Sequence, residues 1–157
     1  MTVDVIVSRD EWNDALGDLD AFCATLVDAC RARLPQLGKG AEWCVNFSDD
    51  AEVARLNYDF RGKNESTNVL SFPSDDVCPD EAEVPREAYL GDVIFAFETV
   101  AKEAEEGGLS LREHTAHLFI HGLLHMLGYD HETDRDAGAM EALEIDILAD
   151  LGIENPY

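Results

Sequence analysis

The stretch HGLLHMLGYDH, residues 121–131, contains three of the chain's five histidines. Residues four apart on a helix lie on one face, separated by about 6 Å along the axis. His121 and His125 can therefore bind the same ion, whereas a third ligand for a tetrahedral site has to come from outside that helical turn. Gly128 suits the left-handed position that ends a helix, and it would let His131 turn back toward the pair. The spacing predicts a site for a divalent metal ion.

Three neutral imidazoles around zinc leave a fourth position for water, which is the arrangement of a catalytic rather than a structural zinc site. The spacing H-x-x-x-H-x-x-G-x-x-H also occurs in the metzincin proteases. In those enzymes a glutamate follows the first histidine and acts as the general base, but here Gly122 occupies that position. A zinc metallopeptidase is therefore the least favoured of the functions that this motif allows.

Two further histidines and an aspartate accompany the motif. His117 and His114 extend the same helical stripe one and two turns earlier. We expect both to contact a metal-binding side chain or solvent rather than the metal, although either could orient a substrate or shuttle a proton. Asp130 could accept a hydrogen bond from the free N–H of a ligand imidazole, but it is equally well explained as a surface turn residue.

The bulk composition predicts one soluble domain spanning residues 1–157. A chain of 17.4 kDa with 46% apolar residues can bury a sizeable core without cross-links. No apolar run reaches the roughly 18–20 residues of a membrane span, and the N-terminal residues lack the basic and apolar regions of a signal peptide. We therefore expect a cytoplasmic protein without a membrane partner. Its four cysteines include no C-x-x-C pair and are expected to be reduced and mostly buried.

Hydrophobic periodicity predicts a succession of strands and helices. Strands are expected over residues 2–8, 41–48, 68–73 and 89–97, and helices over residues 19–34, 49–60, 98–106, 111–127 and 133–152. This order indicates one α+β domain in which helices cover a small four-stranded sheet. The first two histidines of the motif would then lie near the end of the long helix over residues 111–127.

The net charge of −23 is the most unusual feature of the composition. It repels polyanions at long range and, taken alone, argues against a nucleic-acid-binding protein, because phosphate contacts require lysine and arginine. Basic residues outnumber acidic ones in only two short stretches, residues 31–39 and 55–63.

Four segments together resemble the YbeY family of bacterial zinc-dependent single-strand endoribonucleases, which act in ribosomal RNA maturation. They are LNYDFRGKNESTNVLSFP (residues 56–73), YLGDVIFAFETVAKEA (89–104), the histidine motif and MEALEIDILADLGIENPY (140–157), in this order. The histidine motif is the most specific of the four, whereas the N-terminal part of the chain carries little of the resemblance.

The resemblance implies that one zinc ion per chain binds to His121, His125 and His131, and that Arg61 is the catalytic arginine. It also implies helices packed on a small mixed sheet, with the metal in an open cleft. The implied function is single-strand-specific cleavage of RNA in ribosomal RNA processing, including maturation of the 16S rRNA 3′ end, and in ribosome quality control. Asn68 departs from the family, which usually has aspartate at that position.

The implied reaction agrees with the chemistry of these residue types. RNA cleavage develops negative charge on a phosphorane-like transition state, which a zinc ion and a guanidinium group can both stabilise. The attacking group is either a water activated by zinc or the ribose 2′-OH, with zinc acting as a Lewis acid. The sequence favours neither route.

The acidic composition means that RNA binding needs a further explanation. We expect the ribosome or small-subunit assembly proteins to present the single-stranded RNA, so that contacts with protein supply the affinity. Arg55, Arg61 and Lys63 would then form a local basic lip. The second-ranked function is a non-catalytic ribosome assembly factor, in which zinc only holds the last two helices together.

Overall fold

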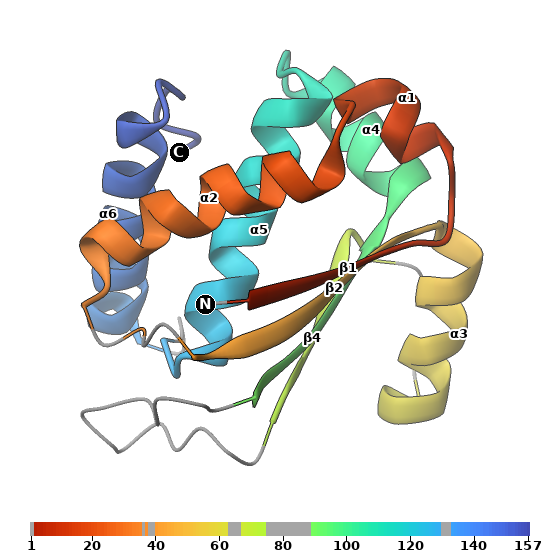
Figure 1. Cartoon of the computed structure of the whole chain (residues 1–157), viewed down its shortest axis with the longest axis horizontal. Helices are drawn as coiled ribbons and strands as arrows, with labels where there is room; N and C mark the ends of the chain where they lie inside the picture. The colour runs from red at the N-terminus through yellow and green to blue at the C-terminus, as the bar shows by residue number, and fades with distance from the viewer. Residues whose placement is uncertain (1, 36, 38–39, 63–66, 75–88, 130–132) are drawn as a thin grey trace.

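The computed structural model describes residues 2–35, 37, 40–62, 67–74, 89–129 and 133–157, without the side chain of Arg61. These residues form one α+β unit of four strands and six helices (Figure 1). The strands are β1 (Thr2–Val7), β2 (Glu42–Ser48), β3 (Val69–Pro73) and β4 (Tyr89–Ala96), and the helices are α1 (Glu11–Leu16), α2 (Leu19–Arg33), α3 (Asp50–Arg61), α4 (Phe97–Glu106), α5 (Leu111–Met126) and α6 (Asp134–Asp150). Each predicted strand and helix is present, within two residues of its expected bounds.

The four strands form one mixed sheet in the order β1-β2-β4-β3. β1, β2 and β4 run parallel, and β3 pairs antiparallel with β4 at the edge of the sheet. Parallel neighbours require a crossover connection, which α1 and α2 provide between β1 and β2. In Figure 1, α2 and α5 lie on one side of the sheet and α3 lies on the other. The predicted class, an α+β domain with a small mixed sheet, is confirmed.

The sheet separates two apolar cores because successive side chains of a strand point to opposite faces. On β4, Val93 and Phe95 enter the large core shared with α2 and α5. Ile94 and Ala96 enter a smaller core that α3 covers. All four side chains are at most 4% exposed. β4 is thus buried on both faces, as its continuous apolar sequence indicates.

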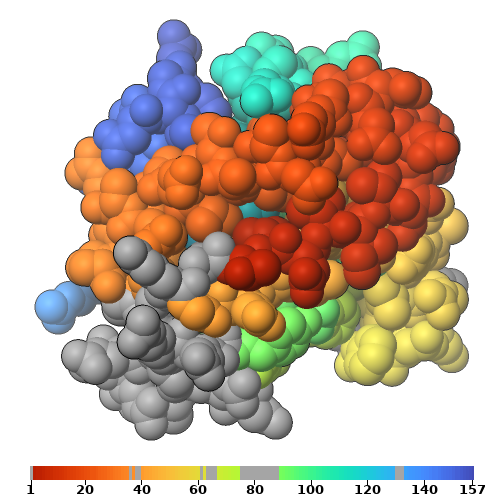
Figure 2. Space-filling view, viewed as in Figure 1, coloured from red at the N-terminus to blue at the C-terminus, as the bar shows by residue number. Residues whose placement is uncertain are grey.

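One element, α1, has no counterpart among the predicted ones. Trp12 anchors it: the side chain is fully buried, and its indole N–H donates to the carbonyl oxygen of Ser48 at 2.8 Å. The ring also meets Phe47 edge-on, with centroids 5.2 Å apart. Figure 2 shows α1 and α2 as a band across this face of the molecule, beside β1. A helix of six residues is too short for periodicity to reveal, so tertiary contacts of one tryptophan specify it.

Capping fixes both ends of α5, the helix that carries the first two histidines of the motif. Ser110 and Glu113 form a capping box at its start, in which each side chain bonds to the backbone N–H of the other residue. The helix ends at Met126, and Gly128 follows with φ 95°. Gly128 therefore ends the helix at the predicted place, because a positive φ favours glycine.

The described cysteines are thiols, as expected. Cys23 and Cys30 are buried, and burial raises the pKa of both thiols to about 12, so neither ionises readily at neutral pH. Cys44 is partly exposed, and Cys78 lies outside the described residues. In the described part of the chain, no helix combines the length and the apolar character that crossing a membrane requires.

Two glycines provide a test of this backbone geometry. Gly91 lies in β4 where the register with β2 shifts, with φ 136°, and a Cβ there would lie 2.2 Å from the carbonyl oxygen of Phe72. Gly91→Ala should therefore lower the free energy of unfolding by about 2 kcal/mol or more. Gly138, inside α6, has no atom within 4 Å of its Cβ position. Gly138→Ala should raise the free energy of unfolding by about 0.5–1 kcal/mol.

Urea unfolding of both variants beside the wild type measures the two effects. Because each variant adds a single methyl group, the opposite signs depend on backbone conformation and local space alone. A neutral or stabilising Gly91→Ala substitution would contradict the described path of β4 past β3.

Candidate metal centre between β3 and α5

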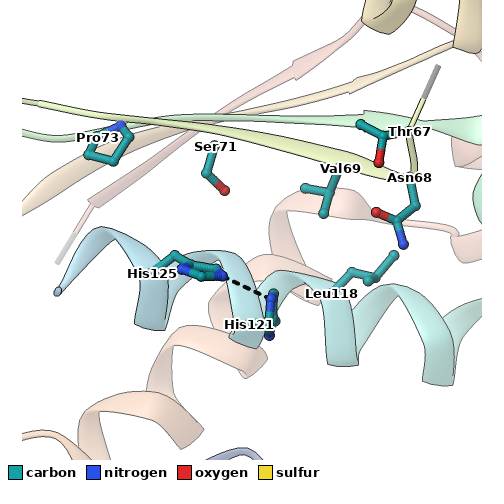
Figure 3. Close-up of a pocket in the computed structure, with 8 residues that line it drawn as sticks. All are labelled: Thr67, Asn68, Val69, Ser71, Pro73, Leu118, His121 and His125. Carbon is teal, nitrogen blue, oxygen red and sulfur yellow. Dashed lines mark hydrogen bonds between the residues drawn. The ribbon is translucent and has the colours of Figure 1, made fainter. Parts of the chain in front are cut away.

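A groove of about 560 Å³ lies between the edge strand β3 and α5. Figure 3 shows Val69 and Ser71 pointing from β3 toward α5, while His121 and His125 face the groove from the helix. Leu70, between the two strand residues, points into the core under α3. The groove is lined by Thr67, Asn68, Val69, Ser71, Pro73, Leu118, His121 and His125. Two of the three histidines of the motif thus meet in one cleft.

The two groove histidines are close enough to share one ion. Their Nε2 atoms lie 3.0 Å apart, and their rings are inclined at 85°. Two nitrogen ligands of a tetrahedral zinc ion, at bond lengths near 2.0–2.1 Å, are separated by about 3.3 Å. A shift of a few tenths of an ångström would therefore turn this contact into a pair of zinc ligands. The donor set of His121 and His125 fits zinc.

Glu144 of α6 holds the opposite edge of the His121 ring. Its Oε1 lies 2.5 Å from Nδ1 of His121, and the carboxylate is fully buried. An ionised carboxylate only accepts hydrogen bonds, so Nδ1 carries the proton and the lone pair of Nε2 faces the groove. Metal-binding histidines are usually oriented by such a carboxylate.

The second oxygen of Glu144 is shared by two further side chains. Nε2 of His117 lies 3.0 Å from Oε2, and the hydroxyl of Tyr157 donates to the same oxygen. The hydroxyl is also 3.2 Å from Nε2 of His117. His117 therefore contacts the carboxylate that orients His121, one helical turn before the groove pair.

These contacts keep Glu144 ionised in spite of its burial. Burial alone would raise its pKa, because a charged carboxylate loses its hydration. Hydrogen bonds from the two histidines and the tyrosine hydroxyl outweigh this effect, and the pKa of Glu144 is lowered to about 2. Conversely, burial and the neighbouring carboxylate raise the pKa of the Tyr157 hydroxyl, so it remains a donor.

Neither Glu144 nor Tyr157 is among the site residues predicted from the sequence. Glu144 could have been found from the sequence, because it lies on the same face of the predicted last helix as apolar residues. In the structure, it shares one buried face of α6 with Met140, Ile147 and Leu148. An acid on an otherwise apolar helical stripe requires a partner, because an unpaired buried charge is costly. Tyr157 leaves no comparable signal, because its contact with Glu144 arises only in the folded chain.

Several predicted site residues fall outside what the structure describes. Arg61 is the last residue of α3, but its side chain is not described. Lys63, Asp130 and His131 lie outside the described residues altogether. Within the described ranges, no group of three or more histidine, cysteine or acidic side chains could hold a metal ion. The roles of these four residues stay predictions.

Comparisons with known proteins give the relatives of this chain. The family model described as Endoribonuclease YbeY matches residues 9–152. The chain is 46% identical over 165 residues to an endoribonuclease YbeY of Jannaschia sp. (strain CCS1), covering 100% of both chains. It is 49% identical over 154 residues to one of Sphingopyxis alaskensis, covering 93% of this chain and 91% of the relative.

The fold of this chain is similar to that of a protein whose structure has been solved. The solution structure of a Thermotoga maritima protein matches with a TM-score of 0.59 and 19% identity, covering 96% of this chain and 91% of that one. At this level of identity, the likeness concerns the fold alone.

The buried carboxylate leads to a prediction about acid stability. Because the folded-state pKa of Glu144, about 2, lies below its ordinary value of 4.5, its contribution to stability is complete above pH 4.5 and is lost as pH falls through 2. In Glu144→Gln, this part of the pH dependence should be absent. The variant should also be less stable at pH 7, by about 1–3 kcal/mol.

Urea unfolding at pH 7, 4.5 and 3 measures the difference in the free energy of unfolding between the wild type and Glu144→Gln. Glu141→Gln, on the exposed side of α6, is the matched control and should follow the wild type. A difference between the wild type and Glu144→Gln that stays constant from pH 4.5 to 3 would contradict the lowered pKa.

Proposed function

Because this chain belongs to the endoribonuclease YbeY family, we propose that it is a zinc-dependent, single-strand-specific endoribonuclease. We propose that it acts in ribosomal RNA processing, including maturation of the 16S rRNA 3′ end, and in ribosome quality control. The family supports the reaction class, cleavage of RNA. The observation that carries the proposal is the pair of Nε2 atoms of His121 and His125, 3.0 Å apart in the groove.

One zinc ion per chain is held, in this proposal, by His121, His125 and His131. The first two come from α5, and the third lies in the sequence between Gly128 and the start of α6. When bound, the ion supplies Lewis-acid stabilisation of charge that develops at the scissile phosphate. Glu144 holds the proton on Nδ1 of His121, so Nε2 stays available as a ligand.

Arg61 is proposed to bind phosphate oxygens of the RNA. Its guanidinium can donate two parallel hydrogen bonds, and its charge would stabilise the negative charge of the transition state. Arg61 ends α3, and Gly62 follows with φ 69°, which terminates the helix before the chain returns to β3. In sequence, Arg61 lies six residues before Thr67, which lines the groove. Lys63, two residues later, is proposed to add positive charge there, and Asp130 to contact a ligand imidazole.

We propose that the ribosome or small-subunit assembly proteins present the RNA to this enzyme in the cytoplasm. The net charge of −23 would repel free RNA, so contacts with a partner protein have to supply affinity. Arg55, exposed on α3, would contribute to the basic lip next to Arg61.

The packing of α5 bears on the alternative of a metallopeptidase. A Cβ at Gly122 would lie 3.5 Å from Oγ of Ser71 and from a methyl group of Val93. These are ordinary van der Waals distances, and position 122 faces the sheet. A peptidase would need a catalytic carboxylate at this position, and the chain has glycine there. The alternative of a metallopeptidase is therefore the less favoured one.

Metal analysis combined with an RNase assay tests the proposal most simply. Purified wild-type protein should contain one zinc ion per chain and cleave single-stranded RNA. His125→Ala should lose both, because two remaining imidazoles bind zinc far more weakly than three. Cleavage that persists in a zinc-free His125→Ala protein, folded as judged by circular dichroism, would contradict the proposal.

Substitution of Arg61 separates the nuclease from a non-catalytic assembly factor. Arg61→Ala should lower kcat for RNA cleavage by roughly 100-fold or more while leaving zinc content unchanged, because the arginine stabilises charge in the transition state. Arg33→Ala, which removes an exposed pair with Asp150, is the control and should leave kcat unchanged. Unaltered ribosomal RNA maturation in cells that carry only Arg61→Ala would favour the assembly factor.

Presentation by the ribosome predicts a substrate preference. The same single-stranded sequence should be cleaved with higher kcat/KM within the small ribosomal subunit than as naked RNA, and cleavage of naked RNA should weaken steeply with salt. Equal kcat/KM values for the two substrates would remove the need for a presenting partner.

A further inference from the structure

Asn68 lines the same groove as the histidine pair, at the start of β3. Its carbonyl oxygen accepts a hydrogen bond from the backbone N–H of Ala96 at 2.9 Å, which ties it to the end of β4. Its side-chain amide Nδ2 donates to the carboxylate of Glu103 on α4, at 3.0 Å from Oε2 and 3.3 Å from Oε1. Backbone and side chain are thus each held by a different element.

His114 holds the carboxylate in turn. Its Nε2 lies 2.7 Å from Oε2 of Glu103, and its side chain is only 14% exposed. Because the carboxylate accepts, Nε2 is the donor. The other ring nitrogen, Nδ1, is buried and has no hydrogen-bond partner in the described part of the chain. Among the described residues, the ring therefore has Glu103 as its hydrogen-bonding partner, and a chain of contacts runs from α5 through α4 to Asn68.

This chain of contacts fixes which end of the Asn68 amide faces the groove. A flipped amide would place Oδ1 against the carboxylate of Glu103, where two acceptors repel each other. Figure 3 shows the Asn68 side chain reaching from the strand side of the groove toward α5, where Leu118 and His121 lie. None of the described residues donates a hydrogen bond to that oxygen. Within the described part of the chain, the amide of Asn68 is thus held through its nitrogen, and its oxygen is left as an acceptor at the groove.

We propose that Asn68 contacts the substrate, with its amide oxygen accepting a hydrogen bond from a nucleotide bound in the groove. Glu103 and His114 are positioning residues that hold this amide. The inference rests on the proposed function, since it takes the ligand to be single-stranded RNA. Phosphate groups offer no donor at neutral pH, so the partner is the ribose 2′-OH or an N–H group of a base, either an exocyclic amino group or the ring N–H of guanine or uracil.

In this chain, where the neighbouring side chain is the carboxylate of Glu103, an asparagine at position 68 can meet both requirements at once. Aspartate would keep the acceptor oxygens but place a second carboxylate about 3 Å from Glu103, where like charges repel. The amide donates to Glu103 through one atom and presents an acceptor through the other. Its two ends therefore have different tasks, one within the protein and one toward the ligand.

A double-mutant cycle tests this inference: a substitution in the protein is combined with a substitution in the substrate. The two are coupled if the effect of one on KM disappears when the other is present. The zinc-loaded enzyme and its Asn68→Ala variant are assayed on one single-stranded RNA and on copies with a single 2′-deoxyribose at each position in turn, excluding the nucleotide at the scissile bond. Loss of one hydrogen bond should raise KM about fivefold in Asn68→Ala, with little change in kcat or zinc content. With the wild-type enzyme, one 2′-deoxy substitution should raise KM by the same factor. With Asn68→Ala, the same substitution should leave KM unchanged.

The source of the donor is distinguished by a second set of substrates. If the 2′-deoxy series shows no coupling, oligonucleotides in which a single base is replaced by an analogue without its N–H donor should show it instead: purine for adenine, hypoxanthine or 2-aminopurine for guanine, pyrimidin-2-one for cytosine and 3-methyluracil for uracil. Coupling in neither series would overturn the assignment of Asn68, as would an unchanged KM in Asn68→Ala.

Glu103→Gln tests the positioning residues without removing the acceptor. It should raise KM by about two- to threefold, because the amide of Asn68 can then take both orientations. Glu105→Gln, exposed on the same helix, is the matched control and should leave KM unchanged. A Glu103→Gln variant with wild-type KM would overturn the positioning role.

Equilibrium binding separates this inference from the proposed function. Fluorescence anisotropy of the same labelled oligonucleotides with zinc-loaded protein measures the coupling without any cleavage. Coupling in binding without RNA cleavage would count against the proposed function alone. Cleavage without coupling would count against Asn68 alone.

Discussion

The buried carboxylate of Glu144 joins three parts of the chain that are far apart in sequence. Glu144 lies on α6 and accepts hydrogen bonds from His117 and His121 of α5 and from Tyr157. A buried charge is destabilising by several kcal/mol unless its lone pairs are satisfied. α6 and the C-terminal residues therefore have to pack against α5 in one register. That same register turns Nε2 of His121 toward the groove.

The groove depends on a second constraint, the pairing of β3 as an antiparallel edge strand. Because successive side chains of a strand point to opposite faces, Leu70 enters the small core, whereas Val69 and Ser71 face α5. Gly122 of α5 faces this part of the sheet, with its Cβ position 3.5 Å from side-chain atoms of Ser71 and Val93. The resulting cleft has a pair of imidazoles at one place and the oriented amide of Asn68 at another. The two imidazoles come from a helix, and Asn68, immediately before β3, is held by Ala96 and Glu103.

The sequence predicts those features that depend on local pattern. Periodicity gives the strands and helices, and the spacing of His121 and His125 gives their convergence, because both properties are set within a few residues. Features created by tertiary contact escape the prediction. α1 depends on the packing of Trp12, and the contact of Glu103 with Asn68 joins residues 35 apart. Glu144 is intermediate, since its apolar helical face is visible in the sequence but its partners are not.

Zinc-edge X-ray absorption, together with anomalous diffraction from crystals of the purified protein, would show whether three imidazoles bind one zinc ion at the end of α5. We expect one zinc ion per chain with three histidine nitrogens at about 2.0–2.1 Å, two of them from His121 and His125. The carboxylate of Glu144 should contact Nδ1 of His121. A zinc ion bound elsewhere, diverging rings of His121 and His125, or a fourth protein side chain completing the coordination would contradict it.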